Sequence, residues 1–233
     1  MPVAIITGAS RGLGRATARA LAERGWSLVL DARGAADLEE VVAELSGHTT
    51  VAGVPGDVAS TLHRDELVRR AVELGDLTLL VNNASVLGPS PQPTLADYPL
   101  RTLEEVYRVN VLAPLALIQR ALPALRATGG TIVNVTSDAA VEGYEGWGGY
   151  GSSKAALEQL TNVLAAEEPG LRVHRFDPGD MRTRMHQEAF PDEDISDRPE
   201  PEEHAIPALV RLIEQGPPSG RYRVSDLLEG AQP

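Results

Sequence analysis

The sequence contains no cysteine and only one lysine, Lys154, among its 21 Lys and Arg residues. Without cysteine, disulfides and thiolate chemistry are excluded. No stretch reaches the ~20 apolar residues of a membrane-spanning helix. The apolar start at residues 2–6 is also too short for a signal peptide. These absences favour a cytoplasmic protein.

Positive charge and aromatic side chains are scarce as well. The formal net charge of −12 at pH 7 argues against nucleic acid or an anionic membrane as the main partner. Aromatic residues make up 4% of the chain, so each one near a functional motif is informative. The five histidines lack the spacing of zinc ligands, and we therefore expect no metal site.

Short apolar runs alternate with longer amphipathic segments along the chain. The short runs are mostly rich in branched residues and predict buried strands at 3–7, 27–31, 49–54, 77–82, 131–136 and 172–176. The longer segments predict helices at 13–24, 36–45, 62–74, 103–126, 152–168 and near 205–215. Pro114 and Pro123 should kink or divide the fourth of these helices. A further edge strand is possible at 221–224.

This alternation predicts the fold class. Strands joined through helices by short connections imply parallel pairing with right-handed crossovers. We therefore expect an α/β, Rossmann-like doubly wound parallel sheet in a single domain, residues 1–233. Ligands of such sheets bind beyond the carboxyl ends of the strands. The one shift in composition is the acidic, proline-containing segment at residues 186–203.

Two motifs carry the chemistry. The glycine-rich run TGASRGLG at residues 7–14 lies between the first predicted strand and helix, where backbone amides and a helix N-terminus can hold a pyrophosphate. Tyr150 and Lys154 are four residues apart, so a helix brings both to one face. A nearby ammonium should lower the pKa of Tyr150 and suit it to proton transfer. The alternative is a lysine on a solvated helix face.

Several motifs in order resemble the short-chain dehydrogenase/reductase family, in its compact single-domain form. They are TGxxxGxG at residues 7–14, Asn-Asn-Ala at 82–84, Ser137, Tyr-x-x-x-Lys at 150–154, and Pro-Gly at 178–179 followed by Thr183. The resemblance spans roughly residues 3–225. It implies an oxidoreductase that interconverts a carbonyl and a secondary alcohol, with a nicotinamide cofactor as the hydride carrier.

The resemblance also assigns four catalytic positions. Ser137 matches the serine that orients the substrate carbonyl, although a serine here is also suited to capping a turn. Tyr150 matches the general acid/base, and Lys154 the residue that tunes it and binds the nicotinamide ribose. Asn110 matches an asparagine that distorts its helix and holds a water near the lysine.

The end of the second strand bears on the choice of cofactor. NAD-preferring relatives have an acid that binds the ribose hydroxyls, and alignment from Gly25 puts Ala32 at that position, with Asp31 one residue early. Arg33 follows, and Arg33 with Arg11 could clamp a 2′-phosphate. We therefore expect NADP(H) to be preferred, with NAD(H) possible. A register error of one residue would reverse the preference.

The resemblance implies further cofactor contacts. They come from the glycine-rich turn, from the ends of the third and fourth strands, and from the segment after the sixth strand: Gly8, Ser10, Arg11, Leu13, Gly14, Arg33, Asp57, Val58, Asn82, Ala84, Tyr150, Lys154, Met181 and Thr183. Asp57 alone would be interpreted as a turn residue. Ser85 departs from the family, which usually has glycine there, and so adds a side chain near the nicotinamide.

Substrate contacts should come from loops over the carboxyl ends of the strands. Tyr144 and Trp147 lie between the catalytic serine and tyrosine and should wall the pocket, unless they serve loop packing. Residues 186–203 correspond to a mobile substrate lid in relatives, or to an inert solvated loop. The implied partner is a small-molecule carbonyl or alcohol, and relatives suggest a homodimer or homotetramer. The alternatives are an NAD-dependent alcohol dehydrogenase of the same family and a non-catalytic regulator that senses a dinucleotide.

Overall fold

The computed structural model describes residues 1–228 and contains a parallel sheet in the order β3-β2-β1-β4-β5-β6-β7. Every neighbouring pair of strands is parallel. The strands are β1 (Pro2–Ile6), β2 (Ser27–Ala32), β3 (Val51–Pro55), β4 (Asp76–Asn82), β5 (Thr131–Val135), β6 (Arg172–Asp177) and β7 (Gly220–Arg223). Along the sheet, the strand order runs outward from β1 on one side and outward from β4 on the other. This reversal of strand order between β1 and β4 defines a doubly wound, Rossmann-like sheet, as the sequence predicts.

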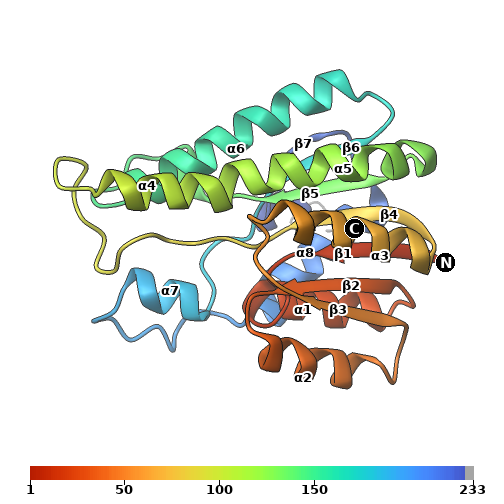
Figure 1. Cartoon of the computed structure of the whole chain (residues 1–233). Coiled ribbons are helices and arrows are strands. Elements are labelled where there is room, and N and C mark those ends of the chain that lie inside the picture. Colours follow the sequence, from red (N-terminus) through yellow and green to blue (C-terminus); the bar gives the residue numbers. More distant parts are fainter. Residues whose placement is uncertain (229–233) are drawn as a thin grey trace.

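Helices fill the crossovers between these strands, and a further helix follows β7. They are α1 (Gly12–Ala22), α2 (Ala35–Leu45), α3 (Thr61–Leu74), α4 (Leu100–Tyr107), α5 (Ala113–Thr128), α6 (Gly148–Glu167), α7 (Arg184–Ala189), α8 (Pro201–Gln215) and α9 (Val224–Leu228). Figure 1 shows the strands running away from the N-terminus, with α7 beyond their carboxyl ends. None of the helices in this part of the chain combines the length and apolar character that spanning a bilayer requires.

The central strands are buried on both faces, which explains why most of their residues are apolar. In β1, Ala4 and Ile6 face one hydrophobic cluster while Val3 and Ile5 face another. Successive side chains of a strand point to opposite faces, so a strand covered on both sides needs no polar alternation. The two clusters are the two halves of the core, one on each face of the sheet.

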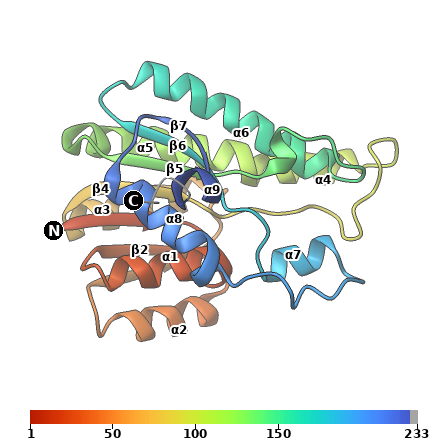
Figure 2. The ribbon, with the colours of Figure 1, turned by 180° about the vertical axis from the view of Figure 1, so that it is seen from behind.

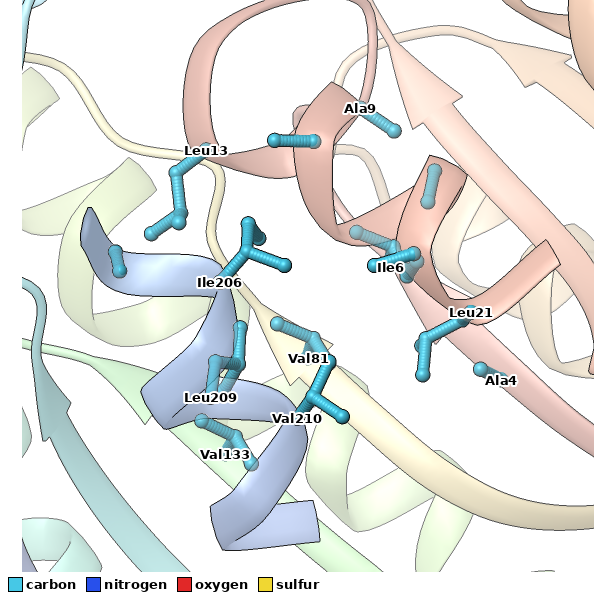
Figure 3. Packing of buried hydrophobic residues seen from close by; sticks show 14 of the residues in the cluster. Ala4, Ile6, Ala9, Leu13, Leu21, Val81, Val133, Ile206, Leu209 and Val210 are labelled. Atoms are coloured by element: carbon cyan, nitrogen blue, oxygen red, sulfur yellow. The ribbon is translucent and has the colours of Figure 1, made fainter. Parts of the chain in front are cut away.

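One half of the core lies between the sheet and helices α1, α2 and α8. Figure 3 shows Ile206, Leu209 and Val210 of α8 directed at Val81 of β4 and Val133 of β5. Seen from behind in Figure 2, α8 and α1 lie against this face. The other half uses apolar residues of α3, α5 and α6. Both faces of the central strands are thereby closed to solvent, and the carboxyl edge of the sheet is left for a ligand.

The predicted helix at 103–126 is divided, but only near the first of its two prolines. Between α4 and α5, the π-helical turn η1 (Arg108–Leu112) replaces the α-helical pattern, and the Ala113 N–H bonds the Arg108 carbonyl five residues earlier. Pro114 has no N–H to donate to the carbonyl of Asn110, which favours this rearrangement. Helix α5 continues through Pro123, so the helix is not divided there.

Other differences concern the ends of elements. Helix α8 starts at Pro201 rather than near residue 205, because proline is well suited to the first turn of a helix. The acidic segment at residues 186–203 includes most of α7 and the start of α8. The predicted edge strand at 221–224 is confirmed as β7, which pairs with β6, although Val224 already begins α9.

Candidate active site

A cavity of about 1460 Å³ lies at the carboxyl ends of the strands. Its lining comes from the turn before α1, the ends of β2, β4 and β5, the first turns of α6, and the segment that connects β6 to α8. These are the places where the sequence motifs occur. One continuous cavity therefore joins the glycine-rich turn to the Tyr-x-x-x-Lys segment.

The glycine-rich turn lacks room for side chains. Gly8 has φ +66°, and a Cβ on it would lie 2.9 Å from Ala84 Cα. A Cβ on Gly14 would overlap the carbonyl of Gly8, so Gly14 lies behind the turn rather than on the cavity surface. Gly12 also has a positive φ, of +52°. The turn is thus a narrow cradle of backbone that only glycine can form.

Asn83 braces this cradle from the end of β4. Its Nδ2 donates to the carbonyls of Thr7, at 2.8 Å, and Gly8, at 3.1 Å. In return, the Thr7 hydroxyl accepts hydrogen bonds from the N–H groups of Asn83 and Ala84, both at 3.0 Å. The four bonds fix the turn against the sheet. Asn83 was not assigned a role from the sequence, although it lies within the Asn-Asn-Ala motif.

The cradle fits the pyrophosphate of a dinucleotide. Helix α1 begins at Gly12, and Gly12 and Leu13 line the cavity. The helix has no side-chain cap and no acidic residue in its first turn, so its first amide groups and the positive end of its dipole are available to an anion in the cavity. Ser10, Arg11 and Leu13 line the cavity beside it. Backbone donors at a helix N-terminus, with an adjacent guanidinium, form an anion-binding site.

Tyr150 and Lys154 both lie in the first half of α6, which confirms the helix on which their pairing depends. Both line the cavity although their exposed fractions are only 8% and 2%. The Lys154 ammonium donates to the carbonyl of Val135, at 2.9 Å, and lies 5.5 Å from the centre of the Tyr150 ring. The alternative of a lysine on a solvated face is therefore wrong.

The pKa of Tyr150 is raised, contrary to the expectation that Lys154 lowers it. Burial of the phenol is the main cause, the Ser85 side chain acts in the opposite direction through a hydrogen bond, and the charges of Asp177 and Asp138 add to the rise. The ammonium is directed at a backbone carbonyl rather than at the phenol oxygen. Burial also lowers the pKa of Lys154 to about 8.

Ser137 follows β5, caps a turn and lines the cavity. Its hydroxyl caps the short 3₁₀ turn η2 (Asp138–Ala140) by accepting from the Ala139 N–H at 3.2 Å. The same hydroxyl donates to Asp138 Oδ1 at 2.9 Å and lines the cavity. The Tyr144 hydroxyl donates to the other oxygen of Asp138 at 3.0 Å.

Asn110 lies in the π-helical turn and is buried outside the cavity lining. Its Oδ1 accepts from the Ser85 hydroxyl, at 3.1 Å, and from the Val86 N–H, at 2.9 Å. Its Nδ2 donates to the Val86 carbonyl, at 2.9 Å, and to Ser153 Oγ, at 3.0 Å. The side chain therefore ties the loop after β4 to helix α6, next to Tyr150.

The glycine-rich turn and the end of β2 contribute two arginines and a buried acid to the cavity. Arg11 and Arg33 are exposed, line the cavity and make no side-chain hydrogen bond or ion pair with residues 1–228. Asp31 is 2% exposed, and its carboxylate contacts the N–H of Gly8 and the ring of His63. Ala32, at the position predicted to select the cofactor, also lines the cavity.

The remaining predicted cofactor residues divide into two groups. Val58, Ala84, Met181 and Thr183 line the cavity, as does Asp57, whose Oδ1 also accepts from the Ala59 N–H at 2.8 Å in a turn. Asn82 does not line it. Its Nδ2 donates to Asn134 Oδ1 at 2.8 Å, within the sheet.

Trp147 and Tyr144, the predicted pocket walls, have different surroundings. Trp147 lines the cavity and packs edge-on against Tyr150, with ring centres 5.7 Å apart. It also contacts Phe190, which follows α7. Tyr144 is 46% exposed and does not line the cavity, but reaches it indirectly through Asp138.

A charged cluster behind the catalytic end was not expected. Arg221 of β7 donates to Glu158 Oε1, at 2.9 Å, to Asp177 Oδ2, at 2.8 Å, and to the carbonyl of Ser137, at 3.3 Å. Nothing in the local sequence reveals it, because its members come from α6, β6, β7 and the segment after β5. Within residues 1–228, no group of three or more His, Asp or Glu side chains is arranged to hold a metal ion.

The chain matches the short chain dehydrogenase family over residues 2–194, and it belongs to that family. It is 34% identical to a rhamnolipids biosynthesis 3-oxoacyl-[acyl-carrier-protein] reductase of Pseudomonas aeruginosa, covering 78% of this chain and 74% of that protein. It is also 34% identical to sepiapterin reductase of Meriones unguiculatus, covering 79% of this chain and 76% of that one.

Solved structures agree with these relatives. An alcohol dehydrogenase from Thermococcus sibiricus, determined with 5-hydroxy-NADP, superposes with a TM-score of 0.84. Its identity to this chain is 31%, and the alignment covers 96% of this chain and 95% of that one. The chain is accordingly a short-chain oxidoreductase of the kind that uses NAD or NADP.

Proposed function

We propose that the protein is an NADP(H)-preferring oxidoreductase that interconverts a carbonyl and a secondary alcohol, with Tyr150 as general acid/base. The observation that carries the proposal is the shared cavity, which has the glycine cradle at one end and Ser137, Tyr150 and Lys154 at the other. An anion site and a proton donor joined by one cavity suit a dinucleotide together with a small carbonyl substrate.

The catalytic end supplies polarisation and a proton. The Ser137 hydroxyl can turn from Asp138 to donate to a substrate oxygen, which stabilises the charge that develops there. The Tyr150 hydroxyl then transfers its proton to that oxygen during reduction, and takes it back during oxidation. A bound nicotinamide cofactor supplies or accepts the hydride. Lys154 provides a positive charge within 5.5 Å of the phenol ring and stabilises the phenolate.

The names of two relatives favour the reductive direction. The Tyr150 phenol, whose pKa is raised by burial, is protonated at neutral pH and can therefore serve as the acid of a carbonyl reduction. Two of the relatives are themselves named as reductases. We infer that the substrate is a ketone or aldehyde with at least one apolar part, because Trp147 and Met185 border the Tyr150 end.

The arginines at the cofactor end support the preference for NADP(H). Guanidinium groups bind phosphate through paired hydrogen bonds, and Arg11 and Arg33 are both available in the cavity lining. Asp31, the acid nearest the position that selects NAD, is buried and already hydrogen-bonded. A solved relative bound to an NADP derivative agrees with this preference.

Calorimetric titration with NADPH and NADH at fixed ionic strength tests the cofactor assignment. We expect NADPH to bind at least tenfold more tightly, a difference of about 1.4 kcal/mol. Tighter binding of NADH would instead favour the NAD-dependent alcohol dehydrogenase. Binding of NADPH without turnover of any ketone or aldehyde in a broad panel would favour a dinucleotide-sensing regulator.

Three further parts of the proposal rest on the sequence and its family. The cytoplasmic location stays a prediction, as does assembly into a homodimer or homotetramer. The role of residues 186–203 as a substrate lid also stays a prediction. Its support is the contact between Trp147 in the cavity wall and Phe190 beside α7, together with the bond from Ser90 Oγ to the Glu188 carbonyl at 2.7 Å.

A further inference from the structure

The carboxylate of Asp31 is held from two sides. Its Oδ1 lies 2.5 Å from Nε2 of His63, and its Oδ2 accepts from the N–H of Gly8 at 3.3 Å. Because a carboxylate only accepts at neutral pH, Nε2 of His63 is the protonated nitrogen of this pair. The exposed fractions of the two side chains are 3% for Asp31 and 8% for His63. The acid is therefore fixed within the protein rather than presented to solvent.

Asp31 lies at the position in the fold where an acid can affect which cofactor is bound. In dinucleotide-binding sheets, an acid at the end of the second strand bonds the adenosine ribose hydroxyls and so selects NAD. Asp31 lies in β2 one residue before Ala32, and both residues line the cavity. A carboxylate directed into the cavity here would also repel the 2′-phosphate of NADP. Its orientation thus bears directly on the choice of cofactor.

The partner histidine, His63, comes from a distant part of the chain, and its ring packs over a glycine that leaves room for it. His63 belongs to the first turn of α3, 32 residues from Asp31. Its ring passes over Gly56, where a Cβ would lie only 2.7 Å from His63 Cε1. Gly56 is itself anchored by its N–H to the carbonyl of Ala32 at 2.9 Å. A side chain at residue 56 would push the imidazole away from the carboxylate.

We propose that His63 is a specificity-determining residue, which selects NADP(H) by holding the Asp31 carboxylate away from the adenosine ribose. The hydrogen bonds from His63 and from the Gly8 N–H hold the carboxylate between α3 and the glycine-rich turn. The exposed guanidinium groups of Arg11 and Arg33 are then the charges that a 2′-phosphate meets in this part of the cavity. This inference rests on the preference for NADP(H) proposed above.

Calorimetry on a set of His63 variants tests the inference, with the ratio of the NADH to the NADPH dissociation constant as the readout. In His63→Leu, which cannot donate a hydrogen bond, we expect the ratio to fall about tenfold, through tighter NADH binding and weaker NADPH binding. His63→Gln keeps an N–H donor and should retain most of the wild-type ratio. The matched control is His48→Leu at an exposed histidine, which should leave the ratio unchanged.

Variants of Asp31 keep the inference testable even if His63→Leu fails to fold. Asp31→Asn should leave NADH affinity within about twofold of wild type, and in the His63→Leu background it should abolish the gain in NADH affinity. A tenfold loss of NADH affinity in Asp31→Asn alone would mean that Asp31 already binds the ribose, which overturns the inference.

The inference and the proposed function fail in distinguishable ways. Wild-type protein that prefers NADPH, with the same ratio in His63→Leu, would overturn the role of His63 and leave the proposed function intact. Wild-type protein that prefers NADH would overturn the proposed cofactor preference, and the inference with it. A preference for NADPH that falls in His63→Leu and is restored by adding Asp31→Asn supports both.

Discussion

Lys154 illustrates the conflict between stability and function at the scale of one residue. The residue is 2% exposed, and burial lowers the pKa of its ammonium from 10.5 to about 8. At roughly 1.4 kcal/mol for each pKa unit, charging this group inside the protein costs about 3 kcal/mol. The hydrogen bond to Val135 offsets only part of that cost. A chain that otherwise uses arginine keeps a costly lysine at the position where the proposed function requires one.

Lys154→Met should therefore stabilise the fold while it abolishes turnover. Removing the buried charge should raise the free energy of unfolding by at least about 1 kcal/mol, which raises Tm by about 2–4 °C in a chain of this size. Differential scanning calorimetry at pH 7 measures the shift. A lower Tm would show that the bond to Val135 outweighs the cost of burying the ammonium.

His174 should make the protein sensitive to acid. It is completely buried in β6, neither ring nitrogen has a hydrogen-bond partner among the described residues, and burial lowers its pKa from 6.5 to about 4. Between these two values the unfolded chain binds a proton that the folded chain does not. The folded state therefore loses no stability to the titration of His174 above pH 6.5, and its free energy of unfolding decreases as the pH falls from 6.5 toward 4.

The contribution of His174 to this loss has a slope of up to about 1.4 kcal/mol per pH unit. Urea unfolding from pH 7 to pH 4.5 should show a shallower decline in His174→Leu than in wild type. His48→Leu, at an exposed position, serves as the control and should follow the wild-type curve. Equal slopes in wild type and His174→Leu would contradict the assignment.

Residues that act through local spacing could be predicted, whereas those that act through distant contacts could not. Tyr150 and Lys154 are one helical turn apart, so their common face follows from the helix alone. The raised pKa of Tyr150 could not be foreseen, because it depends on burial by other segments. The pairing of His63 with Asp31 joins α3 to β2 and has no local signal.

At the scale of elements, β7 connects the carboxyl-terminal part of the chain to the catalytic end. Arg221 bonds the carboxylates of Glu158 and Asp177 as well as the carbonyl of Ser137. The side chains of this cluster are at most 17% exposed. Removing the arginine would leave two buried carboxylates without their cation, which is costly.

Arg221→Met should destabilise the protein by about 3 kcal/mol or more and lower kcat by loosening Ser137. Arg223→Met, in the same strand but exposed, is the matched control and should change the stability by less than about 0.5 kcal/mol. Urea unfolding compares the two variants. Equal free energies of unfolding in Arg221→Met and Arg223→Met would mean that the Arg221 cluster stabilises the protein no more than surface ion pairs do.

The elements themselves were largely predictable, and their ends were not. The buried strands are short apolar runs, which is why β1, β2 and β4 could be located from the sequence. The two prolines of the fourth helix look alike in sequence, yet only the one beside Asn110 accompanies a π-helical turn. Which proline disrupts a helix depends on tertiary contacts such as those of the Asn110 side chain.

At the scale of the whole molecule, the sheet brings two separate chemistries into one cavity. The amino-terminal half supplies the glycine cradle and the arginines, and the segment after β5 supplies Ser137, Tyr150 and Lys154. The cavity could be anticipated from the doubly wound topology, which gathers the carboxyl ends of parallel strands at one edge. Cofactor binding and turnover should be separable by mutation, because different elements form the two ends of the cavity.

Turnover and cofactor binding in Tyr150→Phe test this account most directly. The variant keeps the ring that packs against Trp147 but lacks the hydroxyl that transfers the proton. We predict that NADPH-dependent reduction of a ketone accepted by the wild type falls at least 100-fold, while the NADPH dissociation constant changes by less than about threefold. Retained turnover would contradict the role of Tyr150, and loss of NADPH binding would contradict the separation of the two ends.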